Sequence, residues 1–313
     1  MVDRYVIVGA GPVGRHTAEL LRDRGDQVVV VTRSGRFTMK GVTSIAADAG
    51  DPDALTRITG GASTLVNAAN PGDYTTWERV WPPLAESFLT VTERTAATLV
   101  AVSNLYPYGP TDAPMVEGQP DLATDHKGRL RAGMWSEAKA RHDAGRIRMV
   151  ELRGADYLGP GVGGNGHITR QLPTATRGRT AWVIGDPDTP HTWTYVADVA
   201  RTVVALAGRP DTWGEIWHVP SPPPRTQRQA LTDVLAAGGY DPVPVRGIPV
   251  VALRAIGVFS PMMREVAEMS YMFRRPYVMD SARTLQTLGL EPTPWDEICR
   301  RTASSISDTP RDF

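Results

Sequence analysis

The fold of this chain is indicated most strongly by one segment near its start, Tyr5-Val6-Ile7-Val8-Gly9-Ala10-Gly11-Pro12-Val13-Gly14. Its first four residues form a short apolar run typical of a buried strand, and a helical pattern follows the glycines. In such a turn the first glycine permits the tight bend, the second lets a pyrophosphate approach the backbone, and the third lets the helix pack closely on the strand. The free amides and the dipole of the helix N-terminus also favour an anion. The segment therefore predicts a dinucleotide-binding turn, with a purely structural glycine turn as the alternative; the expected binding residues are Gly9, Gly11, Pro12, Val13 and Gly14.

Strand-like runs alternate with helix-length segments through the first half of the chain. This alternation predicts an α/β fold, a Rossmann doubly wound parallel sheet, over residues 1–153. Residues 154–313 are expected to form mainly a smaller C-terminal substrate-binding lobe, with some segments returning to the Rossmann core. The expected strands of the sheet are 5–8, 27–32, 44–47, 64–67, 98–103 and 149–153, with a first helix over 15–24. In the lobe we expect short strands at 182–184 and 217–219 and helices over 196–206, 227–238, 250–258, 262–273 and 294–305.

The composition excludes several classes of function. Lys plus Arg and Asp plus Glu are both 34, so no net field attracts nucleic acid or an acidic membrane. No apolar run approaches the roughly 20 residues needed to span a bilayer, and the opening, with Asp3, does not match a signal peptide. The single cysteine, Cys299, fits the reducing cytoplasm. We expect no metal, because the histidines lack a metal-ligand spacing.

The end of the second strand indicates which coenzyme binds. A site for NAD usually carries an acidic residue there to hold the ribose hydroxyls, whereas this chain reads Thr32-Arg33-Ser34-Gly35-Arg36. Two arginines can pair with a 2′-phosphate and the hydroxyls can donate hydrogen bonds, so NADP(H) is favoured over NAD(H). Solvated loop arginines are the alternative. Asp48, after the third strand, is expected at the adenine, and the segment after the fourth strand is expected beneath the coenzyme: Ala68, Ala69 and Asn70.

Seven short motifs, taken in order along the chain, carry a family resemblance. They are VGAGPVG (8–14), AADAGDPDAL (46–55), VNAANPG (66–72), VSNLYPYGP (102–110), ELRGADYLGPG (151–161), TYVADVA (194–200) and LGLEPTPWDE (288–297). With them the chain resembles the extended or atypical branch of the short-chain dehydrogenase/reductase superfamily, the group called NAD-dependent epimerase/dehydratase. The resemblance implies a nicotinamide coenzyme and leaves a homodimer open.

The chain departs from that family at its catalytic positions. Family members carry a Ser or Thr after the fifth strand and a Tyr-x-x-x-Lys motif in which the tyrosine transfers the proton. Matching YPYGP to the family's YGP places Asn104 at the serine position, with Ser103 just before it. Trp135 has the right spacing to Lys139, but a helix starting there would have about 10 residues, or about 15 Å, which is short for one that crosses a sheet.

A start at Lys127 gives a helix of about 18 residues, or about 27 Å, and turns the motif into Lys127-x-x-x-Arg131. Lys127 would then replace the tyrosine, either as a general acid made more acidic by Arg131 and burial, or as the cation that holds the ribose. A solvated helix start is the alternative. His126 is a rival acid because imidazole titrates near neutral pH, and Tyr106 is a further candidate; the family's tyrosine at Tyr108 is usually structural.

The substrate side gives weaker signals. Candidate pocket residues are the loop 155–166 and an aromatic and methionine set that suits an apolar ligand, although such methionines are more often core. That set is Trp193, Tyr195, Trp217, Met262, Met263, Met269 and Met272. The first hypothesis is an NADP(H)-dependent oxidoreductase acting on a carbonyl or conjugated double bond of a small, partly apolar substrate. The alternatives are a sugar-nucleotide epimerase or dehydratase, or a catalytically degenerate NADP(H)-binding sensor.

Overall fold

A seven-stranded parallel sheet is the base of the structure, a computed structural model that describes residues 2–306. The strand order is β10-β6-β5-β4-β1-β2-β3, so the chain winds outward from β1 in both directions, as in a doubly wound Rossmann sheet. The predicted fold class is thereby confirmed. The strands are β1 (Arg4–Val8), β2 (Gln27–Thr32), β3 (Thr43–Ala46), β4 (Thr64–Asn67), β5 (Thr98–Asn104), β6 (Arg148–Gly154) and β10 (Ile216–His218).

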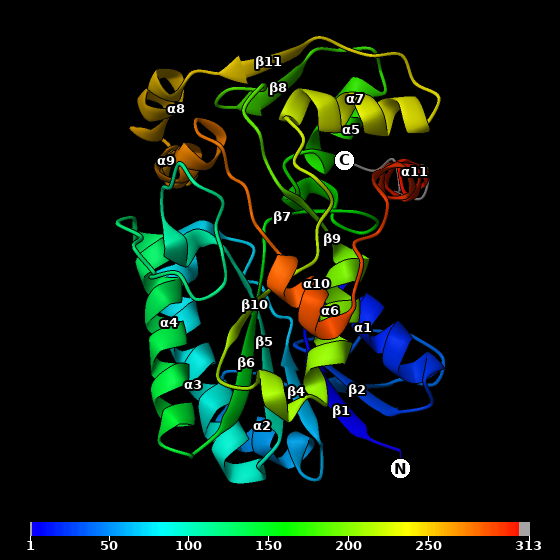
Figure 1. Ribbon diagram of the computed structural model, residues 1–313, viewed down its shortest axis with the longest axis vertical. Coiled ribbons are helices and arrows are strands. Elements are labelled where there is room, and N and C mark those ends of the chain that lie inside the picture. The colour runs from blue at the N-terminus through cyan, green and yellow to red at the C-terminus, as the bar shows by residue number, and fades with distance from the viewer. Residues whose placement is uncertain (1, 307–313) are drawn as a thin grey trace.

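Helices cover both faces of this sheet, which explains the unbroken apolar runs of its strands. Figure 1 shows α3 (Trp77–Thr95) and α4 (His126–Asp143) on one side, with α2 (Pro52–Thr59) packed against α3. On the other side α1 (Pro12–Asp23) packs against α6 (Val196–Ala207). The registers pair Val8 of β1 with Val31 of β2 and with Asn67 of β4. The carboxyl ends of these strands therefore lie at one edge.

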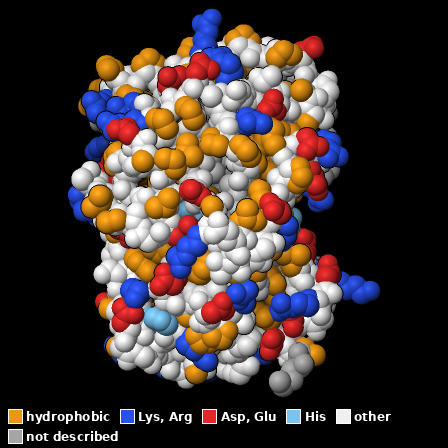
Figure 2. Space-filling model, viewed as in Figure 1, with side chains coloured by type: hydrophobic (Ala, Val, Ile, Leu, Met, Phe, Trp, Pro, Cys, Tyr) orange, Lys and Arg blue, Asp and Glu red, His pale blue; other side chains and the backbone are white. Residues whose placement is uncertain are grey.

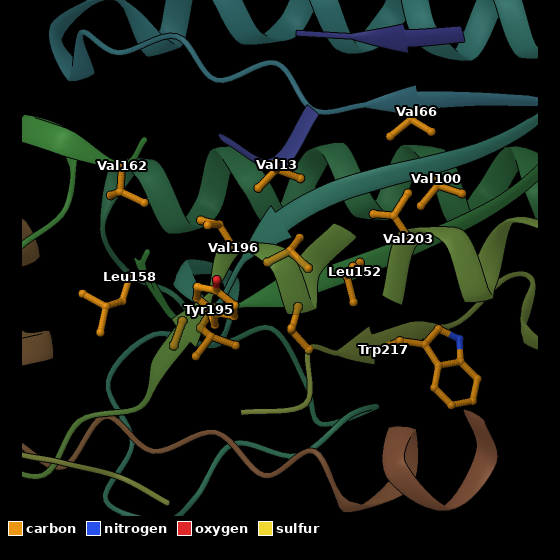
Figure 3. Close-up of a cluster of buried hydrophobic side chains, with 14 of the residues drawn as sticks. Val13, Val66, Val100, Leu152, Leu158, Val162, Tyr195, Val196, Val203 and Trp217 are labelled. Atoms are coloured by element: carbon orange, nitrogen blue, oxygen red, sulfur yellow. The ribbon is translucent and has the colours of Figure 1, made fainter. Parts of the chain in front are cut away.

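Two segments predicted in the smaller lobe belong to the Rossmann core, one as a strand of the sheet and one as a helix that covers it. The predicted helix 196–206 is α6, and the predicted strand 217–219 is β10, which pairs in parallel with β6. Figure 3 shows Val196 and Val203 of α6 in one apolar cluster with Val100 and Leu152 of the sheet. The assignment failed because a short buried strand or helix has the same apolar pattern whichever layer it joins.

The lobe consists of two small parallel strand pairs and several short helices above the carboxyl edge of the sheet (Figure 1). Its elements are β7 (Asp156–Leu158), β9 (Trp193–Tyr195), β8 (Ala181–Ile184), β11 (Val245–Ile248), α5 (Leu172–Ala175), α7 (Gln227–Ala237), α8 (Val250–Gly257), α9 (Pro261–Glu268), η6 (Met269–Phe273) and α11 (Trp295–Ser304). The predicted helix 262–273 is thus α9 followed by the 3₁₀ turn η6.

Two later contacts tie the C-terminal part of the chain to the sheet layer. Helix α10 (Ala282–Leu288) packs beside the sheet on its edge strand β10 (Figure 1). Asp198 of α6 accepts hydrogen bonds from the Thr293 amide at 2.8 Å and its hydroxyl at 2.6 Å, so it has a structural role.

The face of the molecule drawn in Figure 2 carries charges of both signs. Figure 2 shows Lys and Arg side chains interspersed with Asp and Glu over the face in view. Within residues 2–306, no helix combines the length and apolar character needed to cross a membrane. The same residues contain no group of three or more His, Cys, Asp or Glu side chains placed to hold a metal ion.

Candidate active site

A cavity of about 1070 Å³ lies at the carboxyl edge of the sheet, between the sheet and the lobe. It runs from the glycine turn and the end of β2, past the end of β4, to the ends of β5 and β6. A cavity at this edge, where the strand order reverses between β1 and β4, is where doubly wound folds bind ligands. The predicted site residues that line it are Gly9, Gly11, Pro12, Val13, Thr32, Arg33, Asp48, Ala68, Ala69, Asn70, Ser103, Asn104 and Arg131.

Each glycine of the first turn meets a different neighbour. Gly9 has φ +106°, and a Cβ there would lie 2.6 Å from the Ala68 carbonyl oxygen. A Cβ on Gly14 would lie 2.0 Å from the Gly9 carbonyl oxygen, so this glycine lets α1 approach the turn. A Cβ on Gly11 would meet no protein atom within 4 Å. Gly11 also offers no side-chain cap, so first-turn amides of α1 remain available to an anion at the cavity.

At the end of β2 the structure separates the predicted residues. Arg33 lines the cavity and forms no ion pair within residues 2–306. The Thr32 hydroxyl accepts a hydrogen bond from the Gly35 amide at 2.9 Å. Ser34 and Arg36 do not line the cavity; the Ser34 hydroxyl accepts from the Arg36 amide at 3.4 Å. Arg33 is therefore the free cation at this end of the cavity in the described part of the chain.

Helix α4 begins where its length predicted. Asp125 caps it by accepting a hydrogen bond from the Gly128 amide at 2.7 Å, and the helix runs for 18 residues. A Cβ on Gly128 would lie 2.6 Å from the Tyr106 carbonyl oxygen, so the first turn packs directly on the loop after β5. This start places Lys127 and Arg131 one turn apart, in the order that the predicted motif requires.

Arg131 reaches the cavity from α4. It is 6% exposed, and its guanidinium lies 4.4 Å from the Trp81 ring centroid. It donates to the Ser103 hydroxyl at 3.2 Å and to the Val102 carbonyl at 3.4 Å, while its buried Nε has no hydrogen-bond partner. Burial lowers the pKa of Arg131, opposed by the nearby Glu151 carboxylate. An arginine remains charged even so, and its spare donor can serve a ligand.

Lys127 faces the lobe instead. It is 2% exposed, forms a close ion pair with Glu265 of α9 and a second with Glu268 at 3.5 Å, and does not line the cavity. His126 lies on the outer surface, with its ring nitrogen 3.2 Å from Glu78. The structure therefore gathers Ser103, Asn104 and Arg131 at the cavity and places Lys127 in a bridge between α4 and α9.

Four tyrosines line the end of the cavity near Ser103. The hydroxyls of Tyr74 and Tyr106 lie 3.1 Å apart, and Tyr157 donates to the Ser103 carbonyl at 3.2 Å. The buried hydroxyl of Tyr277 has no hydrogen-bond partner. Burial raises the pKa of each of these phenols, so all four are protonated at neutral pH. Tyr106 is a predicted candidate acid and Tyr157 belongs to the predicted pocket loop 155–166, whereas Tyr74 and Tyr277 come from segments without a motif and were not predicted.

Asp156, at the start of β7, belongs to the predicted pocket loop 155–166, although the sequence predicts no individual role for it. Its carboxylate lines the cavity and bonds the His191 Nε2 at 2.7 Å, with the His167 Nε2 at 3.7 Å. Burial alone would raise the pKa of Asp156, but positive charge at His167, the hydrogen bond and charge of His191, and the charge of Arg170 together hold it below its usual value. Burial lowers the pKa of His167 to about 4, so this ring is neutral at pH 7. Asp156 is thus an anion beside neutral imidazole.

The other predicted pocket residues need correction. Of the loop 155–166, several members do line the cavity, including Ala155, Tyr157 and Val162. The aromatic and methionine set does not line it. Trp193, Tyr195, Trp217, Met269 and Met272 are buried in the hydrophobic core, and Figure 3 shows Tyr195 and Trp217 within the apolar cluster. Periodic aromatics mark burial, and burial in a core and in a pocket leave the same pattern.

Comparison with known proteins gives the same picture of the fold. The model of the NAD dependent epimerase/dehydratase family matches residues 5–219. The UDP-glucose 4-epimerase of Thermotoga maritima, solved with UDP-glucose, superposes with a TM-score of 0.79 at 16% identity, covering 97% of this chain and 99% of that one. The dTDP-glucose 4,6-dehydratase of Bacillus anthracis, solved with NAD, gives 0.80 at 12% identity, covering 98% and 97%. WbmH of Bordetella bronchiseptica, solved with NAD+, gives 0.76 at 18%, covering 98% and 99%. No curated protein matches the sequence significantly.

Proposed function

Because the chain belongs to the NAD dependent epimerase/dehydratase family, we propose that it is an enzyme that moves a hydride between a nicotinamide coenzyme and a substrate carbon in the large cavity. The observation that carries the proposal is the continuity of that cavity. One space of about 1070 Å³ joins the glycine turn and Arg33 to Ser103, Arg131 and the tyrosines. A dinucleotide bound at the turn can therefore extend to a set of polar groups at the ends of β5 and β6.

The described residues fit a dinucleotide. Gly9 and Gly14 allow the close approach of α1 to the turn, and the space above Gly11 is free of protein atoms. The open amides at the start of α1 suit a pyrophosphate. A bound coenzyme supplies or accepts the hydride; the protein supplies its position and the proton.

We infer a preference for NADP(H) from the end of β2. Arg33 faces the cavity without an ion-pair partner in the described part of the chain, and no carboxylate follows Thr32 directly. A guanidinium forms charge-assisted hydrogen bonds with a phosphate, each worth about 1.5–3 kcal/mol. Asp48 also lines the cavity, but its carboxylate accepts from the Gly50 amide at 2.9 Å and so stabilises its own loop.

For the proton, the geometry favours groups at the ends of β5 and β6 over Lys127. Arg131 takes the place of the family's lysine, because it is a buried cation that donates a hydrogen bond to Ser103. Its Nε–H has no hydrogen-bond partner in the described part of the chain. Tyr157 lies next to this cation, which favours its phenolate and so opposes the effect of burial. Ser103, Asn104 and Arg131 are the polar groups that would bind and orient a substrate oxygen, with Tyr157 or Tyr106 as the proton source.

The proposal is tested by coenzyme binding and turnover in the purified protein. We expect saturable NADPH binding, with affinity lost in Arg131→Met and kept in Arg129→Met, because Arg129 on the same helix is exposed and bonds only the Thr124 carbonyl. Steady NADPH loss with aldehydes, ketones or enones supports an oxidoreductase. No saturable affinity for NADPH or NADH contradicts the proposal.

The second candidate is sugar-nucleotide epimerisation or dehydration, favoured by the solved relatives bound to UDP-glucose and UDP-glucuronic acid. Conversion of UDP- or dTDP-glucose without net coenzyme loss supports it. Tight coenzyme binding with neither activity supports a coenzyme sensor.

A further inference from the structure

We propose that the substrate carries a positively charged nitrogen, an ammonium or iminium group, that binds at Asp156 and Tyr277 in the cavity. The inference rests on the proposed function and names the substrate class of the same site. It starts from an electrostatic imbalance. Within residues 2–306, Asp156 forms ion contacts with histidines alone, and no Lys or Arg nitrogen lies within 4.0 Å of it, although the more distant charge of Arg170 helps to lower its pKa. A buried carboxylate without a cation in direct contact is costly, and such groups mark binding sites.

Neither of the two histidines supplies the fixed positive charge of a Lys or Arg. Burial keeps His167 neutral, with its pKa at about 4. His191 lies between Phe273 and Tyr277, with ring centroids 4.8 Å and 5.1 Å away, and its Nδ1 is buried without a hydrogen-bond partner. The Asp156 carboxylate therefore contacts imidazole nitrogens only, with His191 Nε2 at 2.7 Å and His167 Nε2 at 3.7 Å.

Tyr277 supplies an independent observation. It is 3% exposed, lines the same cavity, and its hydroxyl has no hydrogen-bond partner in the described part of the chain. A buried hydroxyl without a partner destabilises the fold unless a ligand satisfies it. Asp156 and Tyr277 thus offer an acceptor pair to a ligand that brings donors.

The surrounding rings favour a cation over a neutral donor. Tyr74, Tyr106 and Tyr277 line this end of the cavity, and aromatic rings attract positive charge, as the Lys127 ammonium 5.4 Å from the Tyr74 ring centroid illustrates. A carboxylate among aromatic rings is suited to an organic cation, whereas a diphosphate near Asp156 would meet a like charge. The same site therefore disfavours the anionic part of a sugar nucleotide at this position.

The test compares two small rings of the same shape in NADPH-saturated protein. Piperidine is cationic at pH 7.5, and tetrahydropyran is its neutral counterpart. We expect piperidine to bind at least about tenfold more tightly, by ligand-observed NMR titration, since a partly desolvated charge pair is worth more than about 1.4 kcal/mol. Asp156→Asn should abolish that preference. Asp73→Asn, which alters an exposed carboxylate at the rim of the same cavity, should retain it.

Tyr277→Phe is a second variant, because it keeps the ring and removes only the hydroxyl. We expect it to weaken piperidine about threefold to tenfold while NADPH affinity stays unchanged. Equal affinities for the two rings, or an unchanged preference in folded Asp156→Asn, would overturn the inference. NADPH affinity is titrated separately, so that the two proposals can fail independently. Loss of coenzyme binding would count against the proposed function. Piperidine and tetrahydropyran could still be compared in the coenzyme-free protein.

Discussion

The glycine turn allows a test in which stability and coenzyme affinity respond to different substitutions. Gly14→Ala places a Cβ 2.0 Å from the Gly9 carbonyl oxygen, whereas real Cβ contacts essentially never fall below 3.0 Å. The turn or α1 must therefore move by about 1 Å, and overpacking of this kind costs about 1–3 kcal/mol. In a chain of this size that lowers Tm by about 2–5 °C. Gly14→Ala should thus destabilise the protein with or without coenzyme.

Gly11→Ala should behave in the opposite way. The new Cβ meets no protein atom within 4 Å, and Gly11 has φ −67° and ψ −176°, which alanine adopts without strain. We expect stability to change by less than about 0.5 kcal/mol. The methyl would, however, occupy the side from which a pyrophosphate approaches the amides. Losing one charge-assisted hydrogen bond, about 1.5–3 kcal/mol, corresponds to a loss of about 10-fold to 100-fold in NADPH affinity.

The assay is thermal unfolding followed by calorimetric titration of NADPH into each folded variant. The reasoning fails if Gly11→Ala binds NADPH as tightly as the unmodified chain. It also fails if Gly11→Ala loses as much stability as Gly14→Ala, because the turn would then be structural only.

Three further outcomes are expected. Arg33→Ala should lower NADPH affinity about tenfold or more and leave NADH affinity unchanged, because only the 2′-phosphate pairs with this guanidinium. Parallel titrations of the two coenzymes measure this, and an equal loss of affinity for both would count against an NADP(H) site. Lys127→Met should destabilise the protein by only about 1–2 kcal/mol, since Glu265 and Glu268 stay partly exposed when they lose this partner. Hydrogen exchange in α9 should become faster, while turnover per folded molecule is retained. Lost turnover in the folded variant would support Lys127 as a proton donor. The free energy of unfolding should fall as the pH drops from about 6.5 towards 4, with His167 contributing at most about 3 kcal/mol. The reason is that the pKa of His167 is about 4 in the folded protein and about 6.5 in the unfolded chain, which therefore takes the proton first. Denaturant titrations of His167→Gln should show a flatter pH dependence of stability, and an unchanged slope would exclude His167 as its origin.

Local chemistry made the Rossmann half predictable. The strands 27–32 and 64–67 are found at their predicted bounds, and the third strand is shifted by one residue. The first helix begins at Pro12 rather than at residue 15, because proline suits the first helical position and the apolar periodicity becomes visible only a turn later. These features depend on neighbours in sequence, which a single chain reveals.

The candidate site was predictable only where a motif fixes it. The glycine turn, Arg33 and the start of α4 follow from spacing and helix length. Gly9, Gly11 and Arg33 line the cavity, and α4 begins at His126, one residue before the predicted start at Lys127. Asp156 was predicted only as a member of the pocket loop 155–166, and Tyr277 was not predicted. Their pairing could not be foreseen because they come from β7 and from the segment after η6, about 120 residues apart in the sequence. Contacts between such distant segments have no periodic signature, and neither does the loss of a hydrogen-bond partner on folding.

The chain's route through α6 and β10 limits how this protein can be cut or recombined. After β6 the polypeptide enters the lobe, returns to the sheet for α6 and β10, and leaves again for α7. A fragment that stops at residue 153 would lack the edge strand beside β6 and the helix that covers α1. Exchanging substrate specificity with a relative therefore requires several matched junctions, and a chimera joined at a single crossover should aggregate because a long parallel edge and an apolar face would be exposed together.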